Sequence, residues 1–361
     1  MKEVKTLDIY PISKGKRILT FLGDLFLHYI LSVTLLQFVV FNIASKIVDY
    51  PSKLESNLVT INKRIDILYG NDLLFYDKEE NKHDLDQNLD TTFDYFLKYY
   101  VTDEAEGIDP IKHYFLNIKN SSIDELNQKY LDYGTPFFSL KNSKIFLNQD
   151  YIDYFSPYFN KNDSLSQAGE TYLSSFRKNV FVPLYNYMVN DINNNELTYN
   201  DLSYKELSSI INENENYTKI FNSINISISF ILSFLIIYVL VPYLFKDRST
   251  ISSRVMRQKR IKINNYEFLN RKEYLIIILN NFFMSLTTLF FIGMIFTGAQ
   301  TMFKYDFLMI VSIIAFVYLI INFIVMMVNK FNKSLGELST NTIVIDDNSL
   351  NEIYEYKGYE K

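Results

Sequence analysis

Four long apolar stretches constrain this 361-residue chain more than any other feature of its sequence. They cover residues 18–44, 219–245, 274–298 and 307–328. Roughly 20 apolar residues in a helix cross a hydrocarbon core about 30 Å thick, so each stretch is long enough to span a membrane. A membrane segment must satisfy its own backbone hydrogen bonds, which favours the helix for each stretch. The sequence therefore predicts an all-α polytopic membrane protein with four transmembrane helices.

The first stretch also has features of a signal peptide, because Lys14, Lys16 and Arg17 precede an apolar run. However, the run is about twice the length of a signal peptide's apolar region, and no clear small-x-small cleavage site follows it. We therefore predict a retained transmembrane helix.

Lysine and arginine counts near the spans predict the orientation in the membrane. The tail up to Arg17 carries five such residues, the connection 246–273 carries nine, and the link 299–306 carries one. Both termini are therefore predicted to be cytoplasmic in a multi-pass protein of the cell membrane. The predicted domains are an N-tail with helix 1 (1–46), an extracytoplasmic domain (47–218), helices 2–4 with the basic loop 246–273 (219–328), and a cytoplasmic tail (329–361).

The extracytoplasmic domain has mainly helical periodicity. Leu54, Leu58, Ile61, Ile65 and Leu68 recur every three or four residues, as on one helix face. Ser122 followed by Glu125 is typical of a helix start. The predicted helices also include 84–100, 121–131, 164–189 with a break before Pro183, and 201–214 running into the second span; a β-hairpin is predicted over 136–147.

Two aromatic clusters, 95–100 and 151–159, stand out in this domain. They indicate either core packing, which we favour, or a binding surface. The acidic run from Asp77 to Asp90 lacks the alternating ligands and terminal Glu of a calcium loop, so it is interpreted as a solvated loop.

The sequence contains no catalytic motif that we recognise. It has no cysteine, three histidines without ligand spacing, no phosphate-binding glycine loop, no HExxH and no nucleophile elbow. We therefore predict a protein that is not an enzyme and that uses no cofactor and no metal. Nothing in the sequence indicates nucleic acid as a partner.

Two ionisable residues, Asp24 and His28, lie inside the first apolar stretch, and Arg17 stands at its start. Spacings of seven and four residues place all three on one helix face. Arg17 is expected at the interface among phosphates, too far from Asp24 for a simple pair. A buried carboxylate is costly in a membrane, so Asp24 is expected to have another partner: His28, an Asn of another span, or an Arg of the loop 246–273.

Three short segments resemble the RDD family of membrane proteins. The first is Gly15–Asp24, because the family has an Arg at the entry of its first helix and an Asp inside it. The second is Asp247–Val255, which keeps Thr250 of a Thr-Leu-Gly-Lys loop but has Ser252 at the Gly position. The third is Leu335–Ile345, with Glu337 where the family usually has a second Asp. The resemblance covers about 150 residues, skips 47–218, and implies that Arg17, Asp24 and Glu337 belong together. With His28 on the same helix face, these residues form the predicted polar cluster.

Two functions are consistent with these features. The first is a membrane scaffold or receptor-like protein whose domain 47–218 binds a protein partner, with the basic inner loop contacting anionic lipid or a cytoplasmic protein. The alternative is a cation/proton or small-solute transporter that uses Asp24, as the resemblance implies for some members; four spans are few, so it would require a homo-oligomer. The basic residues expected to make the inner-loop contacts are Arg248, Arg254, Arg257, Lys259 and Arg260.

Overall fold

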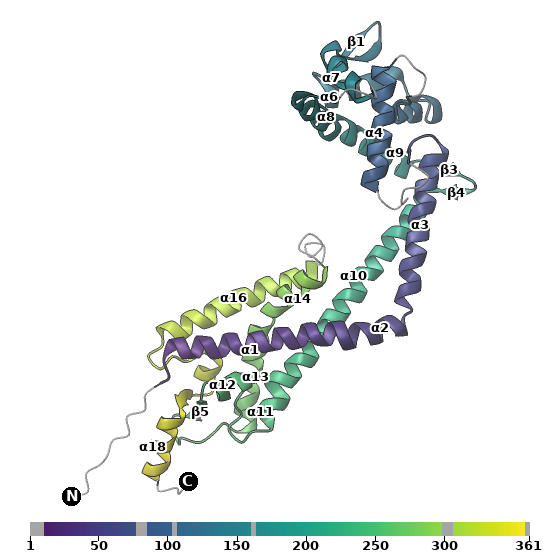
Figure 1. The fold of residues 1–361 in the computed structure, drawn as a ribbon. Helices are drawn as coiled ribbons and strands as arrows, with labels where there is room; N and C mark the ends of the chain where they lie inside the picture. Colours follow the sequence, from purple (N-terminus) through teal and green to yellow (C-terminus); the bar gives the residue numbers. More distant parts are fainter. Residues whose placement is uncertain (1–10, 77–84, 103–106, 160–163, 298–305, 358–361) are drawn as a thin grey trace, which may run out of the picture. The chain divides into compact units, whose positions relative to one another are not determined.

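A computed structural model describes residues 11–76, 85–102, 107–159, 164–297 and 306–357 (Figure 1). The chain divides into two compact units. We call residues Pro51–Asn216 the inserted unit, and Met1–Tyr50 with Tyr217–Lys361 the membrane unit. The domain predicted from sequence had its boundaries at residues 47 and 218.

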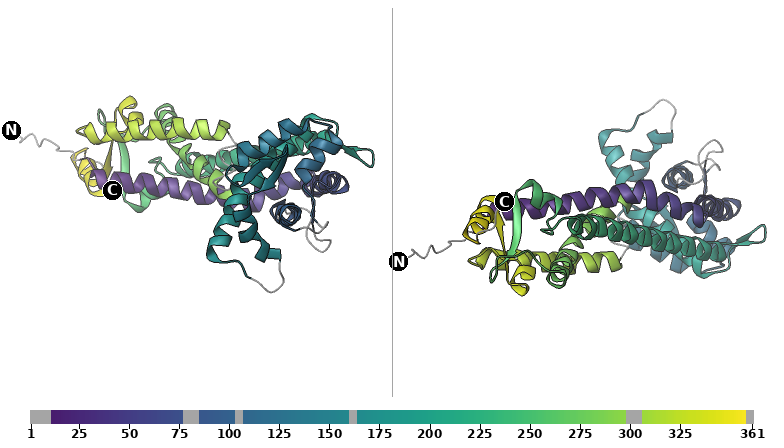
Figure 2. Two further views of the ribbon diagram at one scale, coloured as in Figure 1. Left: turned by 90° about the horizontal axis from the view of Figure 1, so that it is seen from above. Right: turned by 90° about the horizontal axis from the view of Figure 1, so that it is seen from below.

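Within the described residues, four helices are long and apolar enough to cross a membrane, as predicted: Lys14–Ile47, Tyr204–Tyr243, Arg271–Gly293 and Met309–Val328. The first combines α1 (Lys14–Leu35), a π-helical stretch (Leu36–Val40) and α2 (Phe41–Ile47). The second combines α10 (Tyr204–Phe234), a π-helical stretch (Leu235–Leu240) and α11 (Val241–Tyr243). The last two use α13 (Arg271–Ser285), α14 (Thr287–Thr297) and α16 (Asp306–Val328), and α14 lies beside α16 (Figure 2).

Side chains of the membrane unit are arranged as expected for a protein in lipid. Large apolar residues are exposed, for example Phe26 at 61% and Ile314 at 60%. Polar residues such as Asn225 and Ser229 are buried instead. Lipid tails can solvate apolar side chains but offer no hydrogen-bond partner, so this pattern is stable only in a membrane. The fold is that of an all-α polytopic membrane protein.

The third span differs from the single helix predicted over 274–298, because α13 and α14 are separated at Leu286. Thr287 Oγ1 donates to Met284 O at 2.8 Å, and Thr288 Oγ1 donates to Ser285 O at 2.7 Å. Hydroxyl groups that bond to nearby carbonyls compete with the regular helical pattern. Residue 298 lies outside the described residues.

A small polar layer covers one end of the membrane unit, and we call it the end layer. Strand β5 (Gln258–Lys262) pairs antiparallel with β6 (Thr342–Asp346), with Arg260 opposite Val344. Ile12 N donates to Val344 O at 3.1 Å, which attaches the segment before α1. The layer also contains α12 (Ile251–Val255), α17 (Leu335–Ser339) and α18 (Asp347–Lys357).

The inserted unit is mainly helical, as predicted. Its helices are α3 (Tyr50–Gly70), α4 (Leu85–Val101), α5 (Pro110–Lys112) with a π-helical stretch (His113–Ile118), α6 (Ile123–Gly134), α7 (Gln149–Phe159), α8 (Gln167–Phe176) with a π-helical stretch (Arg177–Phe181), and α9 (Val182–Asn194). Its strands are β1 (Phe138–Lys141), β2 (Lys144–Leu147), β3 (Thr198–Tyr199) and β4 (Leu202–Ser203).

Several local predictions in this unit are confirmed. Ser122 caps α6 by accepting a hydrogen bond from Glu125 N at 3.2 Å. The predicted hairpin forms between β1 and β2, with Lys141 opposite Lys144. The break predicted before Pro183 is wrong, because α8 continues through the π-helical stretch into α9. Pro183 is the second residue of α9 and directly follows this π-helical stretch, whose altered hydrogen-bond pattern accommodates a residue without an N–H.

One hydrophobic core holds the inserted unit together, and the aromatic clusters contribute to it. Phe96, Phe155 and Phe176 are fully buried. The core interpretation is therefore confirmed for Phe96 and Phe155. Tyr154 and Tyr158 are different, because they remain 38% and 43% exposed. The first part of the acidic run, residues 77–84, lies outside the described residues.

Candidate functional site

One face of α1 carries a buried polar stripe. Its members are spaced four residues apart: Thr20, Asp24, His28 and Ser32. A helix has 3.6 residues per turn, so they follow one side of α1 into the bundle. The predicted shared face of Asp24 and His28 is therefore confirmed. Their hydrogen-bond partners are nevertheless different.

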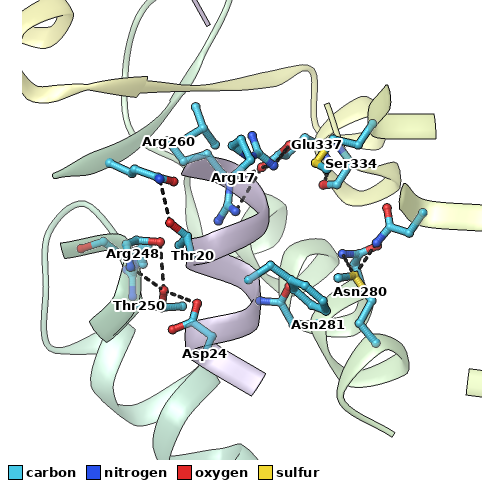
Figure 3. Close-up of a pocket in the computed structure, with 18 of the residues that line it drawn as sticks. Arg17, Thr20, Asp24, Arg248, Thr250, Arg260, Asn280, Asn281, Ser334 and Glu337 are labelled. Atoms are coloured by element: carbon cyan, nitrogen blue, oxygen red, sulfur yellow. Dashed lines mark hydrogen bonds and ion pairs between the residues drawn. The ribbon is translucent and has the colours of Figure 1, made fainter. Parts of the chain in front are cut away.

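Arg17, at the start of α1, pairs with Glu337 of α17. Arg17 Nη2 donates to both carboxylate oxygens of Glu337, at 2.9 and 2.7 Å (Figure 3). Arg260 of β5 donates to the same carboxylate through Nε and Nη2, at 3.2 and 3.1 Å. The Arg17 side chain is only 10% exposed, so the expectation that it stays among lipid phosphates is wrong. We call Arg17, Arg260 and Glu337 the clamp.

The position of Glu337 is fixed by its own helix. Ser334 and Glu337 form a capping box at the start of α17, in which each side chain binds the other residue's backbone N–H. Burial alone would raise the pKa of Glu337, but the positive charges of Arg17 and Arg260 and the hydrogen bonds it accepts lower it to about 2. Glu337 is therefore ionised throughout the physiological range, and the clamp joins three chain segments by charge.

Asp24 has a partner in the loop after the second span. Thr250 Oγ1 donates to Asp24 Oδ2 at 2.6 Å (Figure 3). Ser252 N donates to Asp24 Oδ1 at 3.2 Å. Thr250 also caps α12 by accepting from Ser253 N. Asp24 thus binds the start of a short helix through a hydroxyl and a backbone amide. Of the three partners considered from the sequence, an Arg of the loop 246–273 lies in the correct loop, but the hydrogen bonds come from Thr250 and Ser252.

The chain beside Asp24 has room for this contact because residue 23 is glycine. A Cβ at Gly23 would lie 2.8 Å from Ser252 Oγ, which is closer than real Cβ atoms approach. Gly23 therefore lets α12 approach α1 closely. Gln258 adds a further contact by donating to Thr20 Oγ1 at 2.7 Å.

His28 lies one turn further along α1 and makes its hydrogen bonds away from Asp24. Its Nε2 is 3.3 Å from Phe230 O, and its Nδ1 is 3.1 Å from Thr288 Oγ1. His28 therefore connects the first span to the second and third. The suggestion that His28 is the partner of Asp24 is wrong.

The five basic loop residues fall into two groups. Lys259 pairs with Asp247, and Arg260 belongs to the clamp, so both are neutralised within the protein. Arg254 lies 3.6 Å above the Phe245 ring, and Arg248 lies 4.6 Å above the Tyr243 ring. Arg257 and Arg254 are exposed. Only part of the predicted set is therefore available for a contact outside the protein.

A third contact with the end layer is made by asparagines of the last two spans. Asn322 Oδ1 accepts from Leu335 N at 2.9 Å and so binds the start of α17. Tyr318 donates to Asn280 Oδ1 at 2.9 Å. Gly336 packs against Asn280, where a Cβ would lie 2.9 Å from Asn280 Cβ. The buried asparagines were the sequence signal, because amides inside a membrane segment need partners.

A polar cavity of about 80 Å³ lies among these groups and is lined by residues that include Arg17, Asp24, Asn281 and Glu337. A water molecule needs roughly 10–15 Å³ of such space, so the cavity has room for several. The described residues contain no group of three or more His, Asp or Glu side chains that could hold a metal ion.

The fold and the site define a multi-pass helical membrane protein in which a layer of polar contacts ties the basic loop 246–273 and a tail segment to the transmembrane helices. No protein-family model matches the chain, and no curated protein or solved structure is significantly similar to it.

Proposed function

We propose that the chain is an RDD-type membrane scaffold or receptor-like protein with both termini in the cytoplasm. In this proposal the inserted unit lies outside the cell membrane and binds a protein partner. The end layer is then cytoplasmic, and it attaches the basic loop and the tail to the first span. The nine Lys and Arg residues of the connection 246–273 support this orientation.

The clamp is the observation that carries this proposal. Glu337 is fully buried and accepts hydrogen bonds from Arg17 and Arg260. Breaking a buried ion pair costs about 3–5 kcal/mol, so these groups are suited to fixing structure rather than to releasing and rebinding a cation. The hydrogen bonds from Thr250 and Ser252 to Asp24 also fix structure, because they hold the start of α12 against α1. Each of the three RDD-like segments contributes residues to the clamp or to the contacts of Asp24, and this supports the proposed family.

A second candidate function, cation/proton transport, is favoured by the buried stripe from Asp24 to Ser32 and by the cavity beside Asp24. A polar stripe inside a bundle is a common feature of ion pathways. Purified protein in liposomes distinguishes the two functions. The scaffold proposal predicts that an imposed pH gradient decays equally with wild-type protein and with Asp24→Asn when sodium or potassium is added. Faster decay that Asp24→Asn abolishes would replace it with transport.

The orientation can be tested cleanly because the chain has no cysteine. Asn142→Cys places one thiol in the β1–β2 turn, and Arg257→Cys places one in the exposed part of the basic loop. A membrane-impermeant maleimide should label the first variant in intact cells and the second only after the membrane is opened. The reverse pattern would contradict the proposed orientation.

Partner binding can be tested by photo-crosslinking of the full chain in intact membranes. A photoreactive residue at Tyr154, exposed on the inserted unit, should give a discrete cross-linked species. The same residue at Phe26 on the lipid-facing side of α1 is the matched control. Absence of any species specific to the inserted unit would contradict the receptor-like role.

A further inference from the structure

A small cleft on the inserted unit is lined by only two residue types in the described part of the chain. Its volume is about 310 Å³, and its lining residues are Asp150, Tyr151, Asp153 and Tyr154 of α7 and Tyr172 of α8. No lysine or arginine is among them. Such a composition is selective for the charge of what enters.

The three tyrosine rings that line the cleft differ in orientation. Tyr151 and Tyr172 meet edge to face, with centroids 5.8 Å apart and an interplanar angle of 86°. Tyr154 and Tyr172 are 4.7 Å apart and tilted by 47°. Aromatic faces attract cations, and several rings around one space form a cage for an ammonium or guanidinium group.

The core holds the cage in place. Tyr151 packs against Phe137 at 4.4 Å and against the fully buried Phe155 at 6.2 Å. Tyr154 and Tyr172 stay 38% and 37% exposed. Tyr151 is therefore held by the core, while Tyr154 and Tyr172 remain accessible to a ligand. A site that is partly fixed in advance loses less side-chain entropy when a ligand binds.

The charge of the cleft fits a cation. Asp150 and Asp153 are both exposed, and neither forms a salt bridge within the described part of the chain. Asp153 accepts one hydrogen bond, from Gln149 Nε2 at 3.0 Å. The first turn of α7 contributes about half a positive charge, which two carboxylates outweigh. The site is thus net negative.

The whole domain has the same sign. Residues 47–218 contain 28 acidic and 15 basic residues, a difference of 13 negative charges. A field of this kind attracts basic macromolecules and speeds their encounter, and it does so less at high salt. It favours a basic protein segment over an isolated small cation, because a single small ion gains less from an extended field.

We propose that the cleft between α7 and α8 receives a lysine or arginine side chain from a basic segment of a protein partner. This rests on the proposed function, because it gives the chemistry of the partner that the inserted unit would bind. The cationic group packs against the tyrosine rings, Asp150 and Asp153 provide opposite charge, and the rest of the domain orients the approaching segment.

Binding of a fluorescent lysine–serine repeat peptide to the full chain in nanodiscs tests the proposal, with a glutamate–serine peptide as the negative control. Tyr172→Leu and the double variant Asp150→Asn/Asp153→Asn should each weaken binding by about tenfold in low-salt buffer. Tyr172→Phe keeps the ring and should retain binding within about twofold. Tyr133→Leu, at a tyrosine that is 39% exposed on α6, is the matched control and should have no effect.

Equal binding by all variants, or no binding by wild-type protein, would overturn the proposal. Binding of choline without binding of the lysine peptide would overturn the assignment to a protein segment. Circular dichroism of each variant separates lost binding from lost folding, and the Tyr172→Phe result supports this separation. The assay does not depend on orientation or transport, so its failure can be told apart from failure of the thiol-labelling and liposome tests.

Discussion

A buried carboxylate occurs in each unit, and the two are stabilised in opposite ways. In the inserted unit, Asp109 accepts from the hydroxyls of Tyr100 and Tyr130 and from two backbone amides. Burial raises the pKa of Asp109, and its hydrogen bonds only partly offset this. In the membrane unit, Glu337 is bound by two arginines and its pKa is lowered to about 2. The first acid is embedded in an aromatic core, and the second joins chain segments by charge.

This difference shows what holds each unit together. The inserted unit has one large apolar core, and the hydrogen bonds of Asp109 fix the side chains and backbone around it. The end layer has only a small apolar cluster around Ile261, Ile343 and Ile345. Its attachment to the first span therefore depends on specific polar contacts, which are strong when complete and costly when one partner is removed.

The largest expected effect is in the inserted unit. Phe176→Ala removes a fully buried ring that contacts Phe93, Phe96 and Phe155, among others. The free energy of unfolding of this unit should fall by about 3–5 kcal/mol, measured by chemical denaturation in detergent. Leu140→Ala, at a site that is 51% exposed, is the control and should change it by less than about 0.5 kcal/mol. Equal effects of the two variants would contradict the core assignment.

The second effect is a pH dependence of opposite sign in the two units. The pKa of Glu337 is lower in the folded protein, so its stabilisation is present above about pH 4.5 and is lost as the pH falls toward 2. The contribution is about 3 kcal/mol for a shift of this size. The pKa of Asp109 is raised, so the inserted unit gains stability as the pH falls through that raised value toward about 3.8.

Hydrogen exchange at several pH values measures both units in the same sample. Acidification from about pH 6 to about pH 3 should lower the protection of amides in β5 and β6 and raise it in α4 and α6, where protection is the intrinsic exchange rate at each pH divided by the observed rate. Asp109→Asn and Glu337→Gln should each remove the pH dependence of their own unit only. If the pH dependence of exchange had the same sign in both units, or if one substitution removed it from both, the two acids would not act on their own units separately.

A smaller effect is expected at Asp24. Asp24→Ala leaves the Thr250 hydroxyl and the Ser252 amide without their acceptor, and should destabilise the attachment of α12 by about 1–3 kcal/mol. Thr250→Ala removes the same bond and a helix cap, at a cost of about 1 kcal/mol. A double-mutant cycle should give coupling between the two sites, and additive effects would contradict the contact.

The sequence predicted the features that have a local signal. Spans are visible as apolar runs, α6 begins at its Ser122 cap, and α10 continues from the inserted unit into the second span. The β5–β6 pairing has no such signal, because Gln258–Lys262 is almost entirely polar and its partner lies about 80 residues further along the chain. The Pro183 position was misjudged because a preceding π-helical stretch allows the helix to continue.

The candidate site was predicted in part for the same reason. Arg17, Asp24 and His28 could be placed on one face from their spacing, and Glu337 entered through the family resemblance. Their partners could not be assigned, because they depend on how loops fold back onto α1. Thr250 and Arg260 lie more than 200 residues after α1, and no local pattern connects them to it.

Hydrogen exchange of Glu337→Gln in nanodiscs is the most direct test of the clamp. Glutamine has nearly the same size but cannot neutralise Arg17 and Arg260. Exchange at β5 and β6 should become at least about 100-fold faster, because the loss of a buried pair costs about 3 kcal/mol or more, while α4 should be unchanged. Unchanged exchange in β5 and β6 would contradict the conclusion that this charge pair attaches the end layer to the first span.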